Sequence, residues 1–304
     1  MNAEWAAPET PAEADGPVAR RRPAGVARLD PVSTQPVPVP MRPLSMGEIL
    51  DGAFETIRLA PGLILGLTAL VVVPAELWMS WLDRDLLDGS EWRYVLSRPL
   101  RYLVDAGAET EGPSEWAVWL TMGIGLVVPA ACAVGIGRVL SAWYAGTPIT
   151  ARDAAVEMGK RSWVVLLIAP IRGVASLAFG IPLVFLMLTG PIIGVEGVGP
   201  GAALTRSWNL VNRRFGSALG FYLLSAFLFF VLTATLNVVP LIFGQLFLGE
   251  IRWVLMVAAN IAITVLLTAF LAAGTSLLYL DSRVRVEGLD LELQLVDLWP
   301  EPGR

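Results

Sequence analysis

Histidine is absent from the 304-residue chain, and cysteine occurs once, at Cys132. The lack of histidine excludes a Ser-His-Asp triad, an HExxH zinc site and a histidine general base. A single cysteine excludes an intramolecular disulfide and a cysteine metal cluster, and Cys132 is interpreted as a small residue buried in lipid. We therefore expect a protein that is not an enzyme, with no catalytic residues, no metal and no cofactor.

Charged residues are scarce. They make up 16% of the chain, whereas hydrophobic residues make up 55% and the mean hydropathy is +0.62. A soluble domain of this size usually has about a quarter of its residues charged. The apolar residues gather into runs of about 20 residues, which is the length that crosses a bilayer as a helix. The chain is therefore predicted to be an all-α protein, an integral membrane helical bundle.

Six transmembrane helices are predicted, at about 61–81, 116–140, 163–179, 181–195, 218–243 and 253–279. The third and fourth come from one apolar run, which as a single helix would be about 48 Å long. That length exceeds the hydrocarbon core of about 30 Å, and Gly180-Ile181-Pro182 offers a break near the middle. The run therefore predicts two short helices, which either cross the membrane twice or form a short re-entrant hairpin.

The membrane domain is predicted to cover 43–285. The preceding segment, 1–42, is rich in proline, alanine and acidic residues, so we expect a disordered N-terminal tail. A C-terminal tail, 286–304, follows the domain. The residues at 279–298, YLDSRVRVEGLDLELQLVDL, alternate apolar and charged side chains, which predicts a short strand or an extended surface segment.

An amphipathic segment precedes each predicted pair of membrane helices, beginning near Ser45, Thr150 and Gly199. Ser45 followed by Glu48 is the pattern of a capping box, and the segments are expected to lie at the membrane surface. The chain thus reads as three units, each a cytoplasmic amphipathic helix followed by a membrane hairpin. The alternative is that the three segments are unrelated interfacial anchors.

Basic residues decide the predicted orientation, because they concentrate on the cytoplasmic side of membrane proteins. With the N-terminus inside and six crossings, most of the 22 Lys and Arg residues are cytoplasmic. The opposite side then holds Arg84, Arg93, Arg98, Arg101 and Arg252. We therefore expect a multi-pass protein with both termini cytoplasmic.

Three stretches carry a family resemblance: RPLSMGEILDGAF at 42–54, VEGVGPGAALTRSWNLVNRRF at 195–215 and LLYLDSRVRVEGLDLEL at 277–293. Together they resemble uncharacterised multi-pass membrane proteins of bacteria, mainly actinobacteria, which are similar to the membrane domain of some glycerophosphoryl diester phosphodiesterases. The resemblance implies a six-span helical domain in the bacterial cytoplasmic membrane. It does not imply phosphodiesterase activity, because this chain has no histidine and no fused hydrolase domain.

One candidate site is a cluster at the predicted cytoplasmic surface. Its members are Glu196, Arg206, Trp208, Arg213 and Arg214. Such a cluster suits an anionic lipid headgroup or the acidic face of a partner. The alternative is ordinary anchoring by basic and aromatic residues at the interface.

A second candidate is an intramembrane pair, Glu76 with Arg172, because ionisable residues within spans are costly and usually functional. The alternative is that Glu76 reaches the outer surface and that the helix of Arg172 never enters the bilayer deeply. Asn237 and Asn260 are expected to form interhelical hydrogen bonds. Three Gly-x-x-x-Gly motifs, at 62–66, 190–194 and 216–220, would permit close helix packing.

The sequence thus predicts an integral inner-membrane protein with a lipid-contacting, scaffold or accessory role. Its expected partners are membrane lipids, together with a membrane protein partner or a second copy of the chain, and no nucleic acid is expected. The alternative is a small transporter or channel for a lipid or an amphipathic solute. Transport would need a continuous polar path, and the spans contain few polar groups to build one.

Overall fold

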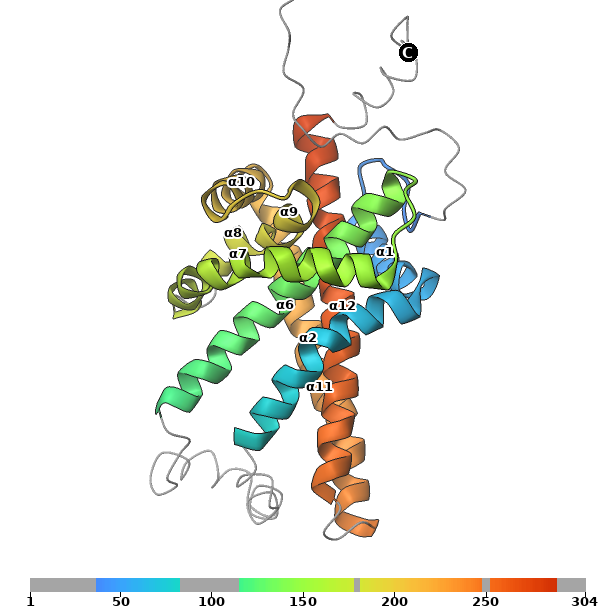
Figure 1. The fold of residues 1–304 in the computed structure, drawn as a ribbon, viewed down its shortest axis with the longest axis vertical. Helices are drawn as coiled ribbons and strands as arrows, with labels where there is room; N and C mark the ends of the chain where they lie inside the picture. The colour runs from blue at the N-terminus through green and yellow to red at the C-terminus, as the bar shows by residue number, and fades with distance from the viewer. Residues whose placement is uncertain (1–36, 83–114, 178–180, 248–251, 289–304) are drawn as a thin grey trace, which may run out of the picture.

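The computed structural model describes residues 37–82, 115–177, 181–247 and 252–288, all in helices and short connections (Figure 1). The helices are α1 (Met46–Leu59), α2 (Pro61–Leu82), α6 (Glu115–Tyr144), α7 (Ala151–Leu177), α8 (Ile181–Leu186), α9 (Thr189–Glu196), α10 (Pro200–Arg213), α11 (Phe215–Phe247) and α12 (Arg252–Glu287). The predicted all-α class is therefore confirmed.

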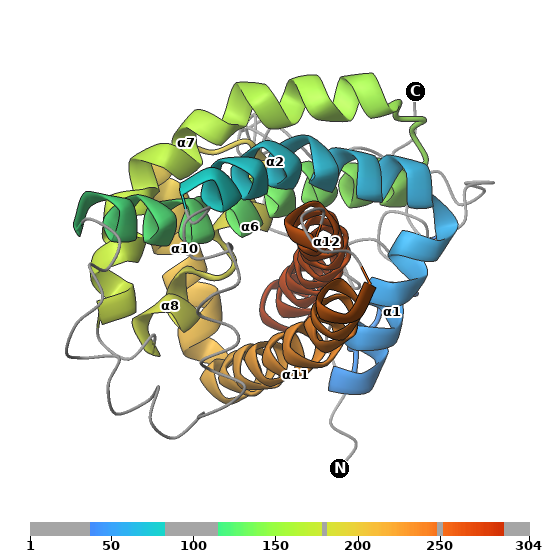
Figure 2. The same ribbon diagram turned by 90° about the horizontal axis from the view of Figure 1, so that it is seen from below.

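Four of these helices, α2, α6, α11 and α12, are long and apolar enough to cross a membrane. They coincide with the predicted spans at 61–81, 116–140, 218–243 and 253–279. Helix α12 occupies the middle of the bundle, and α1, α2, α6 and α11 pack around it (Figure 2). Its buried residues, among them Leu277 and Tyr279, form the centre of the hydrophobic core.

The other two predicted spans, 163–179 and 181–195, are not among the helices of the described residues that are both long and apolar enough to cross a membrane. Helix α7 is described as far as Leu177 and α8 from Ile181, and residues 178–180, next to the predicted break, lie outside the described residues. The apolar half of α7 is about 22 Å long, and α8 and α9 are about 9 and 12 Å, all shorter than a hydrocarbon core. Helix α7 lies across the bundle rather than along α12 (Figures 1 and 2).

The second half of the run at 181–195 is apolar because it is buried in protein, whereas Ile181 at its start is exposed. Six residues of α9 are buried, from Thr189 to Gly194, and α9 packs mainly against α6. A helix that is apolar on all sides is either a membrane span or a core helix. Periodicity alone cannot separate the two, and here the short length of α9 and its burial favour a core helix.

Two amphipathic helices, α1 and α10, lie beside the last turns of α12. We call this end of the bundle the charged end (Figure 1). Ser45 and Glu48 form the predicted capping box at the start of α1. Backbone and side-chain hydrogen bonds from Ser45 keep the pKa of Glu48 below its usual value. At the start of α7, the Asp153 amide donates to the Thr150 hydroxyl at 3.2 Å, as expected for a helix cap.

Two assignments at the edges of the domain are wrong. Residues 279–287 are helical rather than extended, because α12 continues to Glu287, and residues 289–298 of that prediction lie outside the described residues. The charged side chains that alternate in sequence pair at a spacing of four along the helix, Arg285 with Asp281 and Arg283 with Glu287. At the other edge, Val39 of the predicted tail is buried, and its carbonyl accepts a hydrogen bond from the Tyr144 hydroxyl at 2.8 Å. The rest of that tail, 1–36, lies outside the described residues.

Candidate functional site: the charged end and the Arg172 cavity

A buried carboxylate joins three distant parts of the chain at the charged end. The side chain of Asp281 is 1% exposed and forms ion pairs with Arg214 and, at 2.9 Å, with Arg285. Asp281 also accepts a hydrogen bond from the Leu44 amide at 2.8 Å, while Arg285 donates to the Leu44 carbonyl at 2.7 Å. Asp281 therefore ties the segment before α1 and the start of α11 to α12.

A second cluster at the same end connects α9, α10 and α12. Glu196 pairs with Arg206 and accepts a hydrogen bond from the Tyr279 hydroxyl. Arg206 also contacts Glu287 at 2.8 Å. Burial disfavours the charge on Arg206, but the hydrogen bond and the charge of Glu196 outweigh that penalty and raise the pKa of Arg206.

The structure does not bring the five residues of the predicted surface cluster together in one site. Glu196 and Arg206 come together, but their charges are satisfied within the bundle. Arg214 belongs to the Asp281 group, and Trp208 stacks on Phe185 with ring centroids 4.2 Å apart. Arg213 is exposed and forms no ion pair within the described residues. Of the five residues, Arg213 and the half-exposed Trp208 are therefore the ones free to contact a headgroup.

The sequence did not reveal the α12 carboxylates that pair with these arginines. Asp281 and Glu287 were placed in an extended segment, which hid their pairing with arginines along and across α12. The four-residue spacing in DSRVRVE was the available signal, since it places opposite charges one turn apart on a helix.

The predicted pair of Glu76 and Arg172 does not form. Glu76 lies on α2 and accepts a hydrogen bond from the Asn260 side chain of α12 at 2.8 Å. Arg172 lies on α7 and donates to the Leu186 carbonyl at 3.2 Å and to the Thr189 hydroxyl at 3.3 Å. The interhelical role expected for Asn260 is confirmed, whereas the side chain of Asn237 lies outside the described residues.

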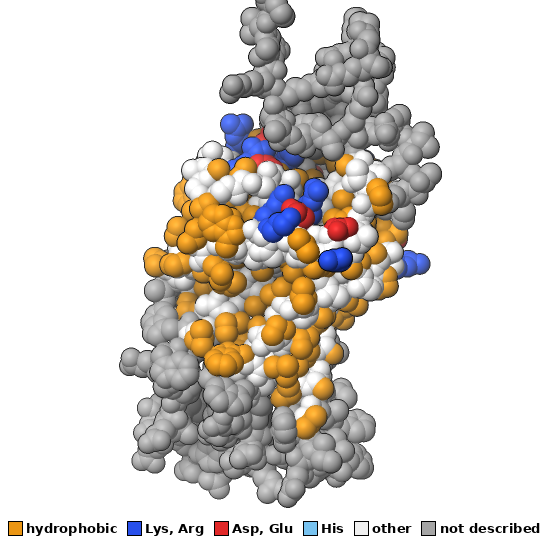
Figure 3. Space-filling view, in the orientation of Figure 1, with side chains coloured by type: hydrophobic (Ala, Val, Ile, Leu, Met, Phe, Trp, Pro, Cys, Tyr) orange, Lys and Arg blue, Asp and Glu red, His pale blue; other side chains and the backbone are white. Residues whose placement is uncertain are grey.

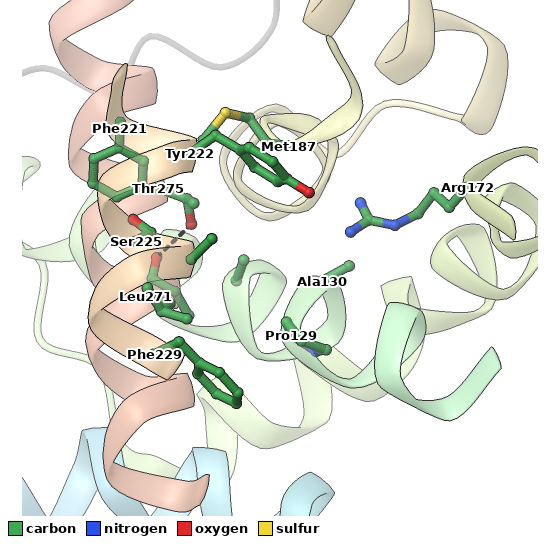
Figure 4. Close-up of a pocket in the computed structure, with 13 residues that line it drawn as sticks. Pro129, Ala130, Arg172, Met187, Phe221, Tyr222, Ser225, Phe229, Leu271 and Thr275 are labelled. Atoms are coloured by element: carbon green, nitrogen blue, oxygen red, sulfur yellow. Dashed lines mark hydrogen bonds between the residues drawn. The ribbon is translucent and has the colours of Figure 1, made fainter. Parts of the chain in front are cut away.

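Arg172 instead faces a cavity of about 310 Å³. The cavity is lined by α6, α11 and α12, by Met187 between α8 and α9, and by Arg172 itself (Figure 4). Pro129, Ala130, Phe221, Phe229 and Leu271 supply apolar walls. Ser225, Tyr222 and Thr275 add hydroxyl groups, and the Tyr222 hydroxyl points toward the guanidinium.

Two buried polar atoms of this lining have no hydrogen-bond partner in the described part of the chain, Arg172 Nε and Ser225 Oγ. Ser225 is 9% exposed. Buried polar groups are nearly always hydrogen-bonded, and exceptions call for an explanation such as an absent ligand or water. The cavity therefore combines an apolar wall with unsatisfied donors beside a cation.

Comparisons with known proteins add no further constraint, because no family model, curated protein or solved structure matches the chain. The resemblance to the phosphodiesterase membrane domain thus stays a prediction.

Proposed function

We propose that the chain is a non-enzymatic, multi-pass protein of the bacterial cytoplasmic membrane with a lipid-contacting, scaffold or accessory role. The observation that carries this proposal is the separation of charge from exposed apolar surface. Charged side chains gather toward the charged end, and hydrophobic side chains dominate the rest of the visible described surface (Figure 3). A water-exposed surface of that kind would be costly, whereas lipid accommodates it.

Large apolar side chains point outward from three of the helices that would face lipid. On α7, Trp163, Leu166, Leu167, Ile171 and Val174 are exposed; on α11, Leu223, Phe227 and Phe230; on α2, Leu70, Leu77 and Trp78. The exposed set on α7 recurs every three or four residues, which describes one face of a helix. The opposite face of α7 is buried in the bundle, so the helix has both a protein side and a lipid side.

We further propose a modified form of the three-unit architecture. Helix α1, the first half of α7 and α10 would each open a unit at the cytoplasmic surface. The hairpins α2–α6 and α11–α12 would cross the membrane, whereas residues 163–196 would enter only part-way and return. An even number of crossings keeps α1, α10 and the end of α12 on one side, in agreement with the basic residues there.

Cysteine labelling tests this topology. In a Cys132→Ala background, Arg58→Cys and Arg213→Cys are expected to react with an impermeant maleimide only from the cytoplasmic side, and Ser80→Cys only from the opposite side. Ile181→Cys, at the tip of the second hairpin, is expected to resist labelling from both sides because lipid surrounds it. Reaction of Ile181→Cys from the outer side would instead establish six crossings, and labelling of positions 58 and 213 from opposite sides would contradict the proposal.

Copurification tests the role itself. Extracted into nanodiscs from native membranes, the chain is expected to retain an enriched anionic lipid class or a stoichiometric membrane protein, as measured by mass spectrometry. A variant lacking three of the exposed cations, Arg58→Gln with Lys160→Gln and Arg213→Gln, should lose much of any lipid held by the surface. Retention of neither a lipid class nor a protein would leave the lipid-contacting and accessory roles unsupported and count against them.

One observation favours the second candidate, a small transporter for a lipid or an amphipathic solute. The Arg172 cavity places a cation and several hydroxyl groups among apolar helices. A flux assay in proteoliposomes distinguishes the two, since a scaffold would not accelerate exchange of a labelled lipid between leaflets.

A further inference from the structure

The geometry of the Arg172 cavity points to a binding site for a single-chain lipid anion, with a carboxylate or phosphate headgroup beside Arg172 and its acyl chain against the apolar walls. This inference rests on the membrane placement proposed above. It concerns a different site from the charged end, whose arginines are mostly paired internally.

The headgroup is argued to be anionic because the cavity presents a cation and hydrogen-bond donors without a carboxylate. Arg172 forms no ion pair with any described acid, and its two hydrogen bonds both come from Nη1. Nε is buried without a partner, and no hydrogen bond from Nη2 is found within the described residues. Arg172 is half-buried, and a guanidinium taken partly out of water without a counterion is costly, so a bound anion would offset that cost.

A hydroxyl group of the cavity can complete the shell of an anion at Arg172. The Tyr222 hydroxyl points toward the guanidinium, whereas Ser225, whose hydroxyl has no partner within the described residues, lies on the opposite side of the cavity (Figure 4). Thr275, by contrast, donates to the Ala272 carbonyl at 3.0 Å, so its proton is already used. Arg172 and Tyr222 are therefore the two donors that we assign to the headgroup.

The rest of the cavity suits an acyl chain rather than a second polar group. Its remaining lining is predominantly apolar, and Ala226 and Phe229 of α11 form an exposed margin. Ser225 lies ten residues after Phe215, which places it about 15 Å along α11 from the charged end. A lipid could thus enter sideways from the bilayer past α11. The volume of about 310 Å³ is at the lower end of the range for small-molecule sites, which favours one chain over two.

Equilibrium binding in nanodiscs of phosphatidylcholine tests the inference, with radiolabelled oleate and lysophosphatidic acid as probes and empty nanodiscs as the baseline. At least one of the two is expected to bind saturably at one molecule per chain, and the preferred probe identifies the headgroup as carboxylate or phosphate. Arg172→Gln should weaken binding about tenfold or more, because charge-assisted hydrogen bonds are lost. Arg152→Gln, which removes an exposed arginine of α7 outside the cavity, should leave binding unchanged.

A second pair of variants distinguishes loss of the site from a folding defect caused by substituting Arg172. Ala226→Trp would fill the cavity from its exposed margin and should abolish binding. Leu223→Trp places the same side chain on α11 at an exposed position that does not line the cavity, and should bind as the parent does. Equal binding by these two variants would overturn the site.

Two further results would also overturn it. The first is that both probes bind the protein in nanodiscs no more strongly than they bind empty nanodiscs. Inorganic phosphate competing as well as lysophosphatidic acid would show that the apolar walls contribute nothing. Failure of the site is separable from failure of the proposed function, because the cysteine labelling above reports membrane insertion independently of any ligand.

Discussion

Asp281→Asn is expected to cost about 2–4 kcal/mol of stability, one of the two largest effects anticipated for a single substitution in this chain. Breaking a buried ion pair by removing one partner typically costs about 3–5 kcal/mol, because the other charge is left uncompensated. Arg214 and Arg285 keep 20% and 36% of their side-chain surface exposed, so solvent screens part of the loss. Thermal unfolding in nanodiscs measures the effect.

A second readout locates the damage. Because Asp281 and Arg285 hold both backbone groups of Leu44, the substitution should also expose the segment at 37–45 to protease under native conditions. Asp51→Asn is the matched control, since Asp51 is an exposed acid on α1 and loses the same charge at the same end. Surface changes of this kind usually stay within about 0.5 kcal/mol. Equal destabilisation by the two variants would show that net charge, and not the Asp281 contacts, is responsible.

Gly194→Ala is expected to destabilise the bundle by about 3 kcal/mol or more. A methyl group at position 194 would lie 2.3 Å from the carbonyl oxygen of Val134 and 3.0 Å from its carbonyl carbon. Those atoms belong to the α6 backbone and cannot rotate away, so α9 and α6 would have to separate. Overpacking usually costs about 1–3 kcal/mol. We expect the upper end of that range here, because a methyl group on the backbone of one helix would meet the backbone of another. The unfolding temperature in nanodiscs reports the loss.

Gly66→Ala supplies the comparison. Gly66 belongs to another Gly-x-x-x-Gly motif, on α2, yet a methyl group there would meet nothing within 4 Å. The variant should be neutral or slightly more stable, because alanine favours a helix over glycine by up to about 1 kcal/mol. Similar losses for the two glycine variants would mean that helix flexibility, not the contact with Val134, explains the result at position 194.

The glycine motifs show what a sequence pattern predicts about helix packing and what it does not. All three share the same spacing, but only Gly190 and Gly194 both approach another helix within contact distance. Gly62, Gly66 and Gly216 face open space, and Gly220 approaches only the end of the Met46 side chain, at 3.8 Å. The spacing places two glycines on one face of a helix, whereas the neighbour of that face depends on how the helices assemble.

Local chemistry made several features predictable from the sequence. Apolar runs longer than a bilayer core mark α2, α6, α11 and α12, because only a long helix buries such a run with its backbone hydrogen bonds satisfied. The capping box of Ser45 and Glu48 is likewise determined by residues within a few positions of each other. Each of these depends on interactions within one turn or one helix.

Contacts between distant segments were decided only by the tertiary structure. The partners of Asp281 are 237 residues away at Leu44 and 67 residues away at Arg214, and no periodicity encodes such a pairing. Whether 181–195 faces lipid or protein is likewise not predictable from the sequence, because the two environments favour the same apolar side chains. The sequence by itself therefore determined the helices and the distribution of charge along them. Only the packed bundle decided which charges meet, which apolar run becomes core, and that Arg172 faces a cavity instead of Glu76.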